Sequence, residues 1–222
     1  MISGAYFTSS FMSIIILMHR ESMHNICLMY EHSMHIFQYI PVDMPHPALY
    51  NTKQTEVHTM EYFDILDVFR RRTGRVRPRG EKMTENEYRH GAEIWIFHTD
   101  GRLMVTRRHL KKDGYPGKWE CTGGLVTTGE STFNTILREA EEEVGIKFAP
   151  KDIRRVATKL CGHEYLDIFT ATTDRPIDSL ILQPTEVIDA RYVTWDELKM
   201  MLDSGEFIPN VYKRLMEFRN LL

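Results

Sequence analysis

A run of 23 residues, from Gly124 to Ile146, constrains this chain more than any other part of its sequence. Glycine near each end and apolar residues at intervals of three or four predict a loop that leads into one amphipathic helix, from Ser131 to Val144. Particular residue types stand at nine fixed positions in the run: Gly124, Glu130, Arg138, Glu139, Ala140, Glu142, Glu143, Gly145 and Ile146.

Three acidic residues share one face of the predicted helix. Glu139, Glu142 and Glu143 are spaced i, i+3 and i+4, so their carboxylates lie side by side. On a bare helix each like-charged pair costs a few tenths of a kcal/mol, and a bound divalent cation reverses that sign. Hard oxygen ligands favour Mg²⁺, with Mn²⁺ as the alternative. The opposite face is apolar and should pack on a sheet: Phe133, Ile136, Leu137, Ala140 and Val144.

A simpler interpretation is that the glutamates form a solvated surface, as most Glu-rich helices do. A solvated surface does not require Gly124, Glu130, Arg138 and Gly145 at fixed distances, so we prefer the functional interpretation. Arg138 can pair with Glu130 or Glu142 and so brace the preceding loop. Glycines in that loop allow backbone groups to approach a ligand closely.

The run matches the Nudix box, GX5EX7REUXEEXGU with U apolar, and the chain resembles Nudix hydrolases over about residues 61–205. The resemblance implies an α/β fold, the Nudix-type α/β/α sandwich with a mixed sheet. It also implies an enzyme, a pyrophosphohydrolase acting on acid anhydrides, that uses a divalent metal to cleave a diphosphate linkage in a nucleoside diphosphate derivative or a similar organic diphosphate.

The resemblance also suggests roles for particular residues. Glu142 and Glu143 would be the main metal ligands, and Glu139 a ligand or the general base that activates water. Glu130 would be a loop brace or an outer ligand. We group Arg138 with the catalytic residues Glu139 and Glu142. The remaining candidates for the metal site are the backbone of Gly124 and an acidic residue from a distant loop, Glu186, with Glu164 as its competitor.

Three short segments stand close together in the sequence: Trp95-Ile-Phe, Leu103-Met-Val-Thr-Arg-Arg-His-Leu-Lys-Lys and Pro116-Gly-Lys-Trp119. Together they are similar to type 1 isopentenyl-diphosphate isomerase, a relative that isomerises its substrate. Arg108 and Lys112 match positions that hold the diphosphate in that enzyme, although an exposed basic stretch is a simpler explanation. The isomerase requires a Cys-x-His-Pro segment where this chain has residues 123–126, and an upstream histidine where it has Arg89. His90 lies one residue away, and we expect it in a loop or at a strand edge. The isomerase, and a Nudix module that senses a nucleotide without cleaving it, are the alternative functions.

Composition changes abruptly near Met60. Residues 1–59 carry six charged side chains but seven of the thirteen methionines and six of the ten histidines. This change in composition predicts that residues 1–59 are a low-charge extension, either poorly ordered or an over-extended start upstream of Met60. It also predicts that residues 60–222 form the Nudix domain. A metal tract in the extension is disfavoured because the spacing of its histidines fits no fixed coordination pattern: His19, His24, His32 and His35.

Within the domain, an Asp-Gly turn between apolar runs predicts a hairpin, and alternating patterns predict further elements. The predicted strands are Glu93–Phe97, Leu103–Thr106, Trp119–Thr122, Arg154–Lys159, Tyr165–Thr170 and Ala190–Val193. The predicted helices after the Nudix box are Trp195–Leu202 and Asn210–Asn220. Three tryptophans could stack on a substrate, but core positions are the better expectation: Trp95, Trp119 and Trp195.

Charge and cysteine content limit the partners. A formal net charge of −3 lacks the single-sign excess that nucleic acid or an anionic membrane attracts, so we expect neither. The apolar run 11–18 is far shorter than the roughly 20 residues of a membrane span. Three scattered cysteines indicate neither disulfides nor zinc and suit a reducing cytoplasm. The predicted partner is a small-molecule diphosphate substrate. A homodimer is possible, because the sequence does not decide the oligomeric state.

Overall fold

The computed structural model describes residues 60–222, and before them only three backbone segments: β1 (Ser3–Ser9), β2 (Met12–Met18) and β3 (Cys27–Tyr30). These segments pair as one antiparallel sheet in the order β1-β2-β3. The chain divides into two compact units at Val57 and His58. The histidines considered above as a metal tract lie outside the described residues: His19, His24, His32 and His35.

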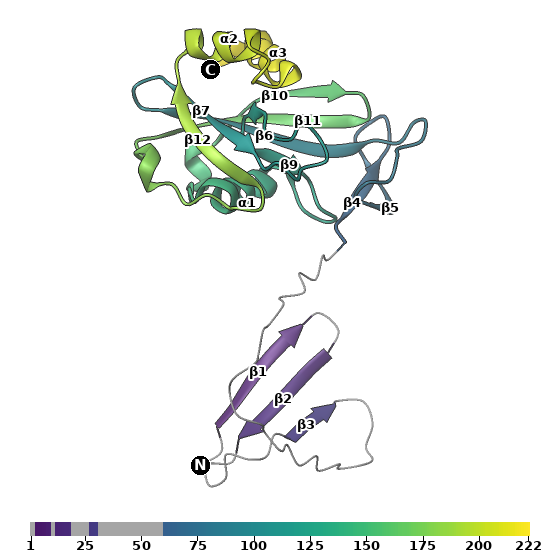
Figure 1. Cartoon of the computed structure of the whole chain (residues 1–222). Coiled ribbons are helices and arrows are strands. Elements are labelled where there is room, and N and C mark those ends of the chain that lie inside the picture. The colour runs from purple at the N-terminus through teal and green to yellow at the C-terminus, as the bar shows by residue number, and fades with distance from the viewer. Residues whose placement is uncertain (1–2, 10–11, 19–26, 31–59) are drawn as a thin grey trace. The chain divides into compact units, whose positions relative to one another are not determined.

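A mixed sheet of seven strands forms the centre of the second unit (Figure 1). Its main path is β10 (Arg154–Cys161), β11 (Glu164–Thr173), β6 (Arg89–His98), β7 (Leu103–Arg108) and β12 (Val187–Val193). Two short strands extend it, β8 (Trp119–Glu120) beside β7 and β9 (Gly123–Leu125) beside β6. Strands β11 and β6 run parallel and the other neighbours run antiparallel, so the predicted mixed sheet is confirmed.

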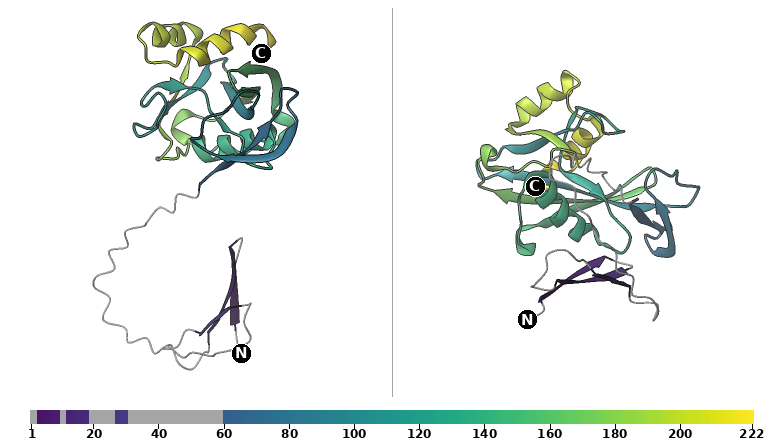
Figure 2. Two further views of the ribbon diagram at one scale, coloured as in Figure 1. Left: turned by 90° about the vertical axis from the view of Figure 1, so that its right-hand side faces the viewer. Right: turned by 60° about the horizontal axis from the view of Figure 1, so that its bottom comes forward.

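Helices cover both faces of this sheet. Helix α1 (Thr132–Val144) lies on one face, and α2 (Trp195–Asp203) and α3 (Pro209–Phe218) lie on the other, as Figures 1 and 2 show. Three short 3₁₀ turns complete the unit: η1 (Pro150–Asp152), η2 (Ile177–Ser179) and η3 (Arg219–Leu221). The α/β/α sandwich implied by the resemblance is therefore confirmed.

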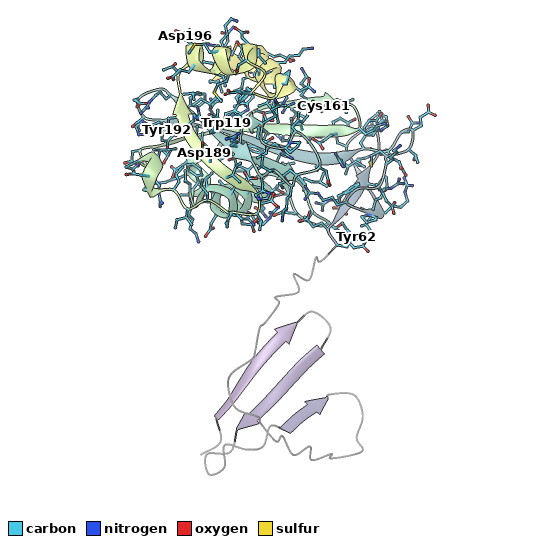
Figure 3. All side chains as sticks on the ribbon, in the orientation of Figure 1. Tyr62, Trp119, Cys161, Asp189, Tyr192 and Asp196 are labelled. Atoms are coloured by element: carbon cyan, nitrogen blue, oxygen red, sulfur yellow. The ribbon has the colours of Figure 1, made fainter. Side chains whose placement is uncertain are left out.

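Alternation along the central strand β6 supplies both halves of the core. Ala92, Ile94 and Ile96 pack with the buried face of α1, whereas Trp95 packs with residues of α2 and α3. Trp95 and Trp119 are at most 2% exposed, which confirms the expectation that they are core residues, whereas Trp195 is only partly buried against this core. Figure 3 labels Trp119, which belongs to the core between the sheet and the helices α2 and α3.

A hairpin that the sequence patterns did not predict precedes the sheet. Strands β4 (Tyr62–Leu66) and β5 (Arg72–Pro78) pair antiparallel. The hairpin begins near Tyr62, which is labelled in Figure 3. Most of β5 is exposed and carries three arginines and a glycine, so it shows none of the apolar alternation by which strands are recognised.

Two expectations need correction. His90 is not in a loop or at a strand edge, because it lies in β6, where it is paired with Tyr165 of β11 and its carbonyl accepts a hydrogen bond from the amide of Val126. The apolar stretch that predicts this strand begins at Glu93, four residues after β6 begins at Arg89. The residues around His90 therefore carry no strand signal of their own. The strand predicted to reach Thr122 ends at Glu120, and the other predicted elements occur with shifted ends.

Candidate active site

Helix α1 is fixed at both ends and along one face. The Ser131 side chain caps its first turn by accepting a hydrogen bond from the amide of Asn134 at 3.1 Å. Gly145 ends it with φ of 69°, in the left-handed region that favours glycine. Ile136, Ala140 and Val144 are 0% exposed, so the helix cannot rotate without opening the core. The glutamates of the opposite face are thereby held in place.

Arg138 connects the loop before the helix to the glutamates on it. Its Nε and Nη2 donate to the Glu130 carboxylate at 3.2 Å each. Its Nη1 lies 2.9 Å from a Glu142 oxygen and 3.1 Å from a Glu139 oxygen. Burial alone would raise the pKa of Glu130, but hydrogen bonds from Arg138 and Thr135 outweigh it and hold that pKa below its ordinary value.

Glu139 lies against Gly124, the glycine that opens the Nudix box. A Cβ atom at Gly124 would lie 2.2 Å from Glu139 Oε1, so no larger residue fits without moving the carboxylate. The Glu139 side chain is 15% exposed. Burial raises its pKa, and the negative charge of Glu142 adds to that rise while Arg138 opposes it.

Glu143 is the most enclosed of the three helix glutamates, at 9% exposed. Burial raises its pKa well above the ordinary value, and the neighbouring charges of Glu139 and Glu120 raise it further. Lys112 and a hydrogen bond with Thr122 act in the opposite direction. A cation placed among these carboxylates would relieve both the burial and the repulsion.

Glu120 is a member of this group that the sequence reasoning missed. It lies on β8, and burial raises its pKa although Arg108 lowers it. Arg108 Nη1 contacts a Glu120 oxygen at 2.5 Å. The missed signal was alternation: Trp119 and Cys121 are buried in the core under α2 and α3, which places Glu120 on the face that carries α1.

The structure brings both predicted diphosphate cations to this group. Arg108 Nε also donates to the carbonyl of Gly114 at 2.7 Å, so its guanidinium bridges Glu120 and the loop between β7 and β8. Lys112 is paired with Glu186. Burial lowers the pKa of Lys112, and the charges of Glu143 and Glu120 partly restore it.

The structure places the two candidates for the distal acidic residue, Glu186 and Glu164, beside different partners. Glu186 comes to the cluster through its ion pair with Lys112, and its backbone carbonyl accepts from His109. Glu164 instead pairs with Arg89 at 3.0 Å and packs against Gly91, at the start of β6. The Nε2 atom of His90 is buried without a hydrogen-bond partner, and burial lowers the pKa of this histidine. The charges that act on His90 include those of Arg70 and Asp167.

The chemistry of the donor set fits a hard divalent cation. Four carboxylates gather around Arg138, Arg108 and Lys112: Glu120, Glu139, Glu142 and Glu143. Within residues 60–222, no group of three or more His, Cys, Asp or Glu side chains is already arranged to hold a metal ion. Arg138 takes up oxygens of Glu139 and Glu142 that a cation would attract. Among the carboxylates that would hold Mg²⁺ or Mn²⁺, Glu139 and Glu142 would have to turn from Arg138 toward the ion.

A separate pocket of about 690 Å³ opens at the far end of β6 and contains none of these residues. Its walls include Phe97 and Trp195, whose ring centroids are 6.1 Å apart, and Arg219, which stacks on Trp195.

Helices long and apolar enough to span a membrane do not occur in the described part of the chain.

Comparison with protein families gives a match over residues 87–215 to the model described as the NUDIX domain. An uncharacterized Nudix hydrolase of Listeria monocytogenes, lmo0368, is 34% identical over 166 residues, which are 72% of this chain and 96% of that protein. Isopentenyl-diphosphate Delta-isomerase of Brevibacterium linens is 32% identical over 138 residues, which cover 57% of this chain and 74% of the isomerase.

A solved structure with the same fold is that of DR0079 from Deinococcus radiodurans. The two structures superpose with a TM-score of 0.61 at 16% sequence identity. The match covers 71% of this chain and 99% of the other. At this identity the likeness concerns the fold.

Proposed function

Because this chain belongs to the Nudix hydrolase family, we propose that it hydrolyses a diphosphate linkage in a nucleoside diphosphate derivative or a similar organic diphosphate, with Mg²⁺ or Mn²⁺ bound to the glutamates of α1. The observation that carries the proposal is the gathering of Glu120, Glu139 and Glu143 in one place, where burial raises the pKa of Glu143 and the other two carboxylates act in the same direction. Mere recognition of a nucleotide does not require such a group of carboxylates.

We assign the roles as follows. Glu142 and Glu143 hold the metal, with the backbone of Gly124 and with Glu186 beside them. When bound, the metal neutralises charge on the diphosphate and lowers the pKa of a water molecule. Glu139 takes the proton from the water that attacks phosphorus, or serves as a further ligand. The phosphoanhydride P–O bond breaks, and the leaving phosphate group keeps the bridging oxygen.

Residues around the helix orient these groups. Arg138 and Glu130 keep the loop before α1 and the Glu139 side chain in register, since Arg138 contacts both carboxylates. Arg108 and Lys112 bind diphosphate oxygens, exchanging their present carboxylate partners for the substrate. Fixed cations next to the metal site suit any substrate with two adjacent phosphate groups.

The isomerase alternative fits less well. Cys121, the cysteine closest to the required segment, is buried in the core with Trp95 and Phe207, on the face of the sheet opposite α1. Burial raises the pKa of its thiol well above the ordinary value. A thiol in that position cannot exchange protons with a substrate held at Glu143.

The test is turnover of the full chain on nucleotide sugars, dinucleotides, nucleoside triphosphates and isopentenyl diphosphate, with Mg²⁺ present or chelated. Glu142→Gln should lower kcat by at least ~100-fold, more than outer-shell residues typically contribute. Glu141→Gln is the matched control, because Glu141 is exposed on the same helix and its side chain pairs, among the described residues, with Lys147 alone. Isomerised product without hydrolysis, or binding without turnover, would replace the proposal with one of the alternatives.

A further inference from the structure

The hairpin β4–β5 lies outside the residues matched by the family model, yet it holds the loop that leads into α1. The amide of Thr128 donates to the Tyr62 carbonyl at 2.8 Å. The amide of Gly129 donates to Asp64 Oδ2 at 2.9 Å. Arg72 Nη2 donates to the carbonyl of Glu130 at 2.5 Å. Three consecutive loop residues are therefore bound to one hairpin.

Asp64 and Arg72 form the centre of this contact. Arg72 Nε lies 3.1 Å from Asp64 Oδ2, the same oxygen that accepts from Gly129. The Asp64 side chain is 18% exposed, so water screens the pair only partly. Gly129 has φ of 82°, a conformation that glycine adopts easily. Because glycine also adopts many other conformations, contacts from outside the loop are needed to hold Gly129 in this one.

The held loop leads directly to the metal-binding glutamates. The Glu130 side chain accepts from Thr127, Thr135 and Arg138. Arg138 in turn contacts Glu139 and Glu142. A shift of the backbone at Glu130 therefore changes the position of Arg138, and through it the carboxylates on the helix.

We propose that Asp64 and Arg72 are positioning residues of the active site, and that the β4–β5 hairpin acts as a clamp that fixes the backbone of residues 128–130. The proposal rests on the proposed function for its catalytic consequence, whereas the clamp itself is a property of the loop. The catalytic unit then begins at the hairpin, about 25 residues before the segment that the family model matches.

The base of the hairpin contributes charge to the same region. Glu61 and Arg79 form an ion pair there at 2.5 Å. Burial is the main cause of the raised pKa of Glu139, and Glu61 adds to it. Burial is likewise the main cause of the lowered pKa of Lys112, and Arg79 adds to it. These charges are a minor addition, and the clamp itself rests on the hydrogen bonds to residues 128–130.

The experiment compares Asp64→Ala with Asp67→Ala in the full chain. Asp67 is the matched control, because it belongs to the same hairpin and binds an arginine, Arg71, while its side-chain hydrogen bonds within residues 60–222 all stay in the hairpin tip. Three quantities are measured for each variant: amide hydrogen exchange of a peptide covering residues 126–131, Mn²⁺ affinity by calorimetry, and kcat and KM for the best substrate of the wild-type chain.

Asp64→Ala should speed exchange at Gly129, weaken Mn²⁺ binding about tenfold and lower kcat about tenfold with KM nearly unchanged, as expected for an outer-shell positioning residue. Asp67→Ala should leave all three quantities at wild-type values, with a similar loss of thermal stability. Asp64→Asn keeps an acceptor oxygen for Gly129 and should recover most of the Mn²⁺ affinity and rate.

Equal behaviour of Asp64→Ala and Asp67→Ala, in exchange and in Mn²⁺ affinity, would overturn the clamp. If Asp64→Ala does not fold, Arg72→Lys gives the same comparison, because lysine keeps the charge near Asp64 but cannot also reach the Glu130 carbonyl. Absence of turnover by the wild-type chain would contradict the proposed function instead, since exchange and Mn²⁺ binding test the clamp without turnover.

Discussion

Two adjacent arginines of β7 show how much the role of a residue depends on the face it occupies. Arg108 contacts Glu120 and the Gly114 carbonyl on the side of α1. Arg107 donates to the Gly117 carbonyl at 3.0 Å and lies opposite Trp119, a core residue of the other face. The sequence singled out Arg108 through a resemblance, and the structure brings it next to the acidic cluster.

Arg108→Ala should raise KM for a diphosphate substrate roughly 10- to 100-fold, because a hydrogen bond to a charged group contributes about 1.5–3 kcal/mol. Arg107→Ala should change KM little, since its guanidinium faces away from the glutamates. Initial rates over a range of substrate concentrations measure both. Equal KM values for the two variants would show that Arg108 does not bind the diphosphate.

At the scale of the element, the end of α1 depends on one glycine. Gly145 has φ of 69°, and a Cβ there would lie 2.9 Å from the Cβ of Ile181. Its amide donates to the carbonyl of Glu141, which closes the helix. The sequence predicted this end of the helix, because glycine after an amphipathic run is a strong stop signal.

Gly145→Ala should lower the free energy of unfolding by about 2 kcal/mol or more, from left-handed strain of ~1 kcal/mol together with the overlap with Ile181. Gly162→Ala is the control, because Gly162 has φ of 61° but no atom of the described residues lies within 4 Å of its added Cβ. It should show the strain alone. Urea unfolding of both variants measures the difference, and equal losses would mean that the contact with Ile181 relaxes freely.

At the scale of the whole molecule, we propose that residues 60–222 form the working domain. Every buried apolar residue of that segment lies between Phe63 and Leu215. The hairpin β4–β5 belongs to the segment although the family model begins at residue 87. The domain boundary should therefore be set by the hairpin rather than by the matched segment.

A chain that starts at Met60 should fold and keep the activity of the full chain within about twofold, because the described core and the contacts of the α1 glutamates lie within residues 60–222. A chain that starts at Glu87 should lose most activity and unfold at a lower temperature, since it lacks Phe63, Ile65 and the contacts to residues 128–130. Turnover and thermal unfolding of the two truncations test this. Full activity of the shorter chain would contradict both the boundary and the clamp.

The sequence by itself determined the helix α1, its end at Gly145 and the positions of Glu139, Glu142 and Glu143 on one face, because helical periodicity and glycine conformation are local properties. It also indicated the mixed sheet through the resemblance. Only the tertiary structure showed Glu120 beside Glu143, Glu186 at Lys112, and Asp64 at Gly129. Those partners lie from 23 to 74 positions apart in the chain. Packing of the sheet brings them together, and no local pattern encodes which distant side chains that packing will join.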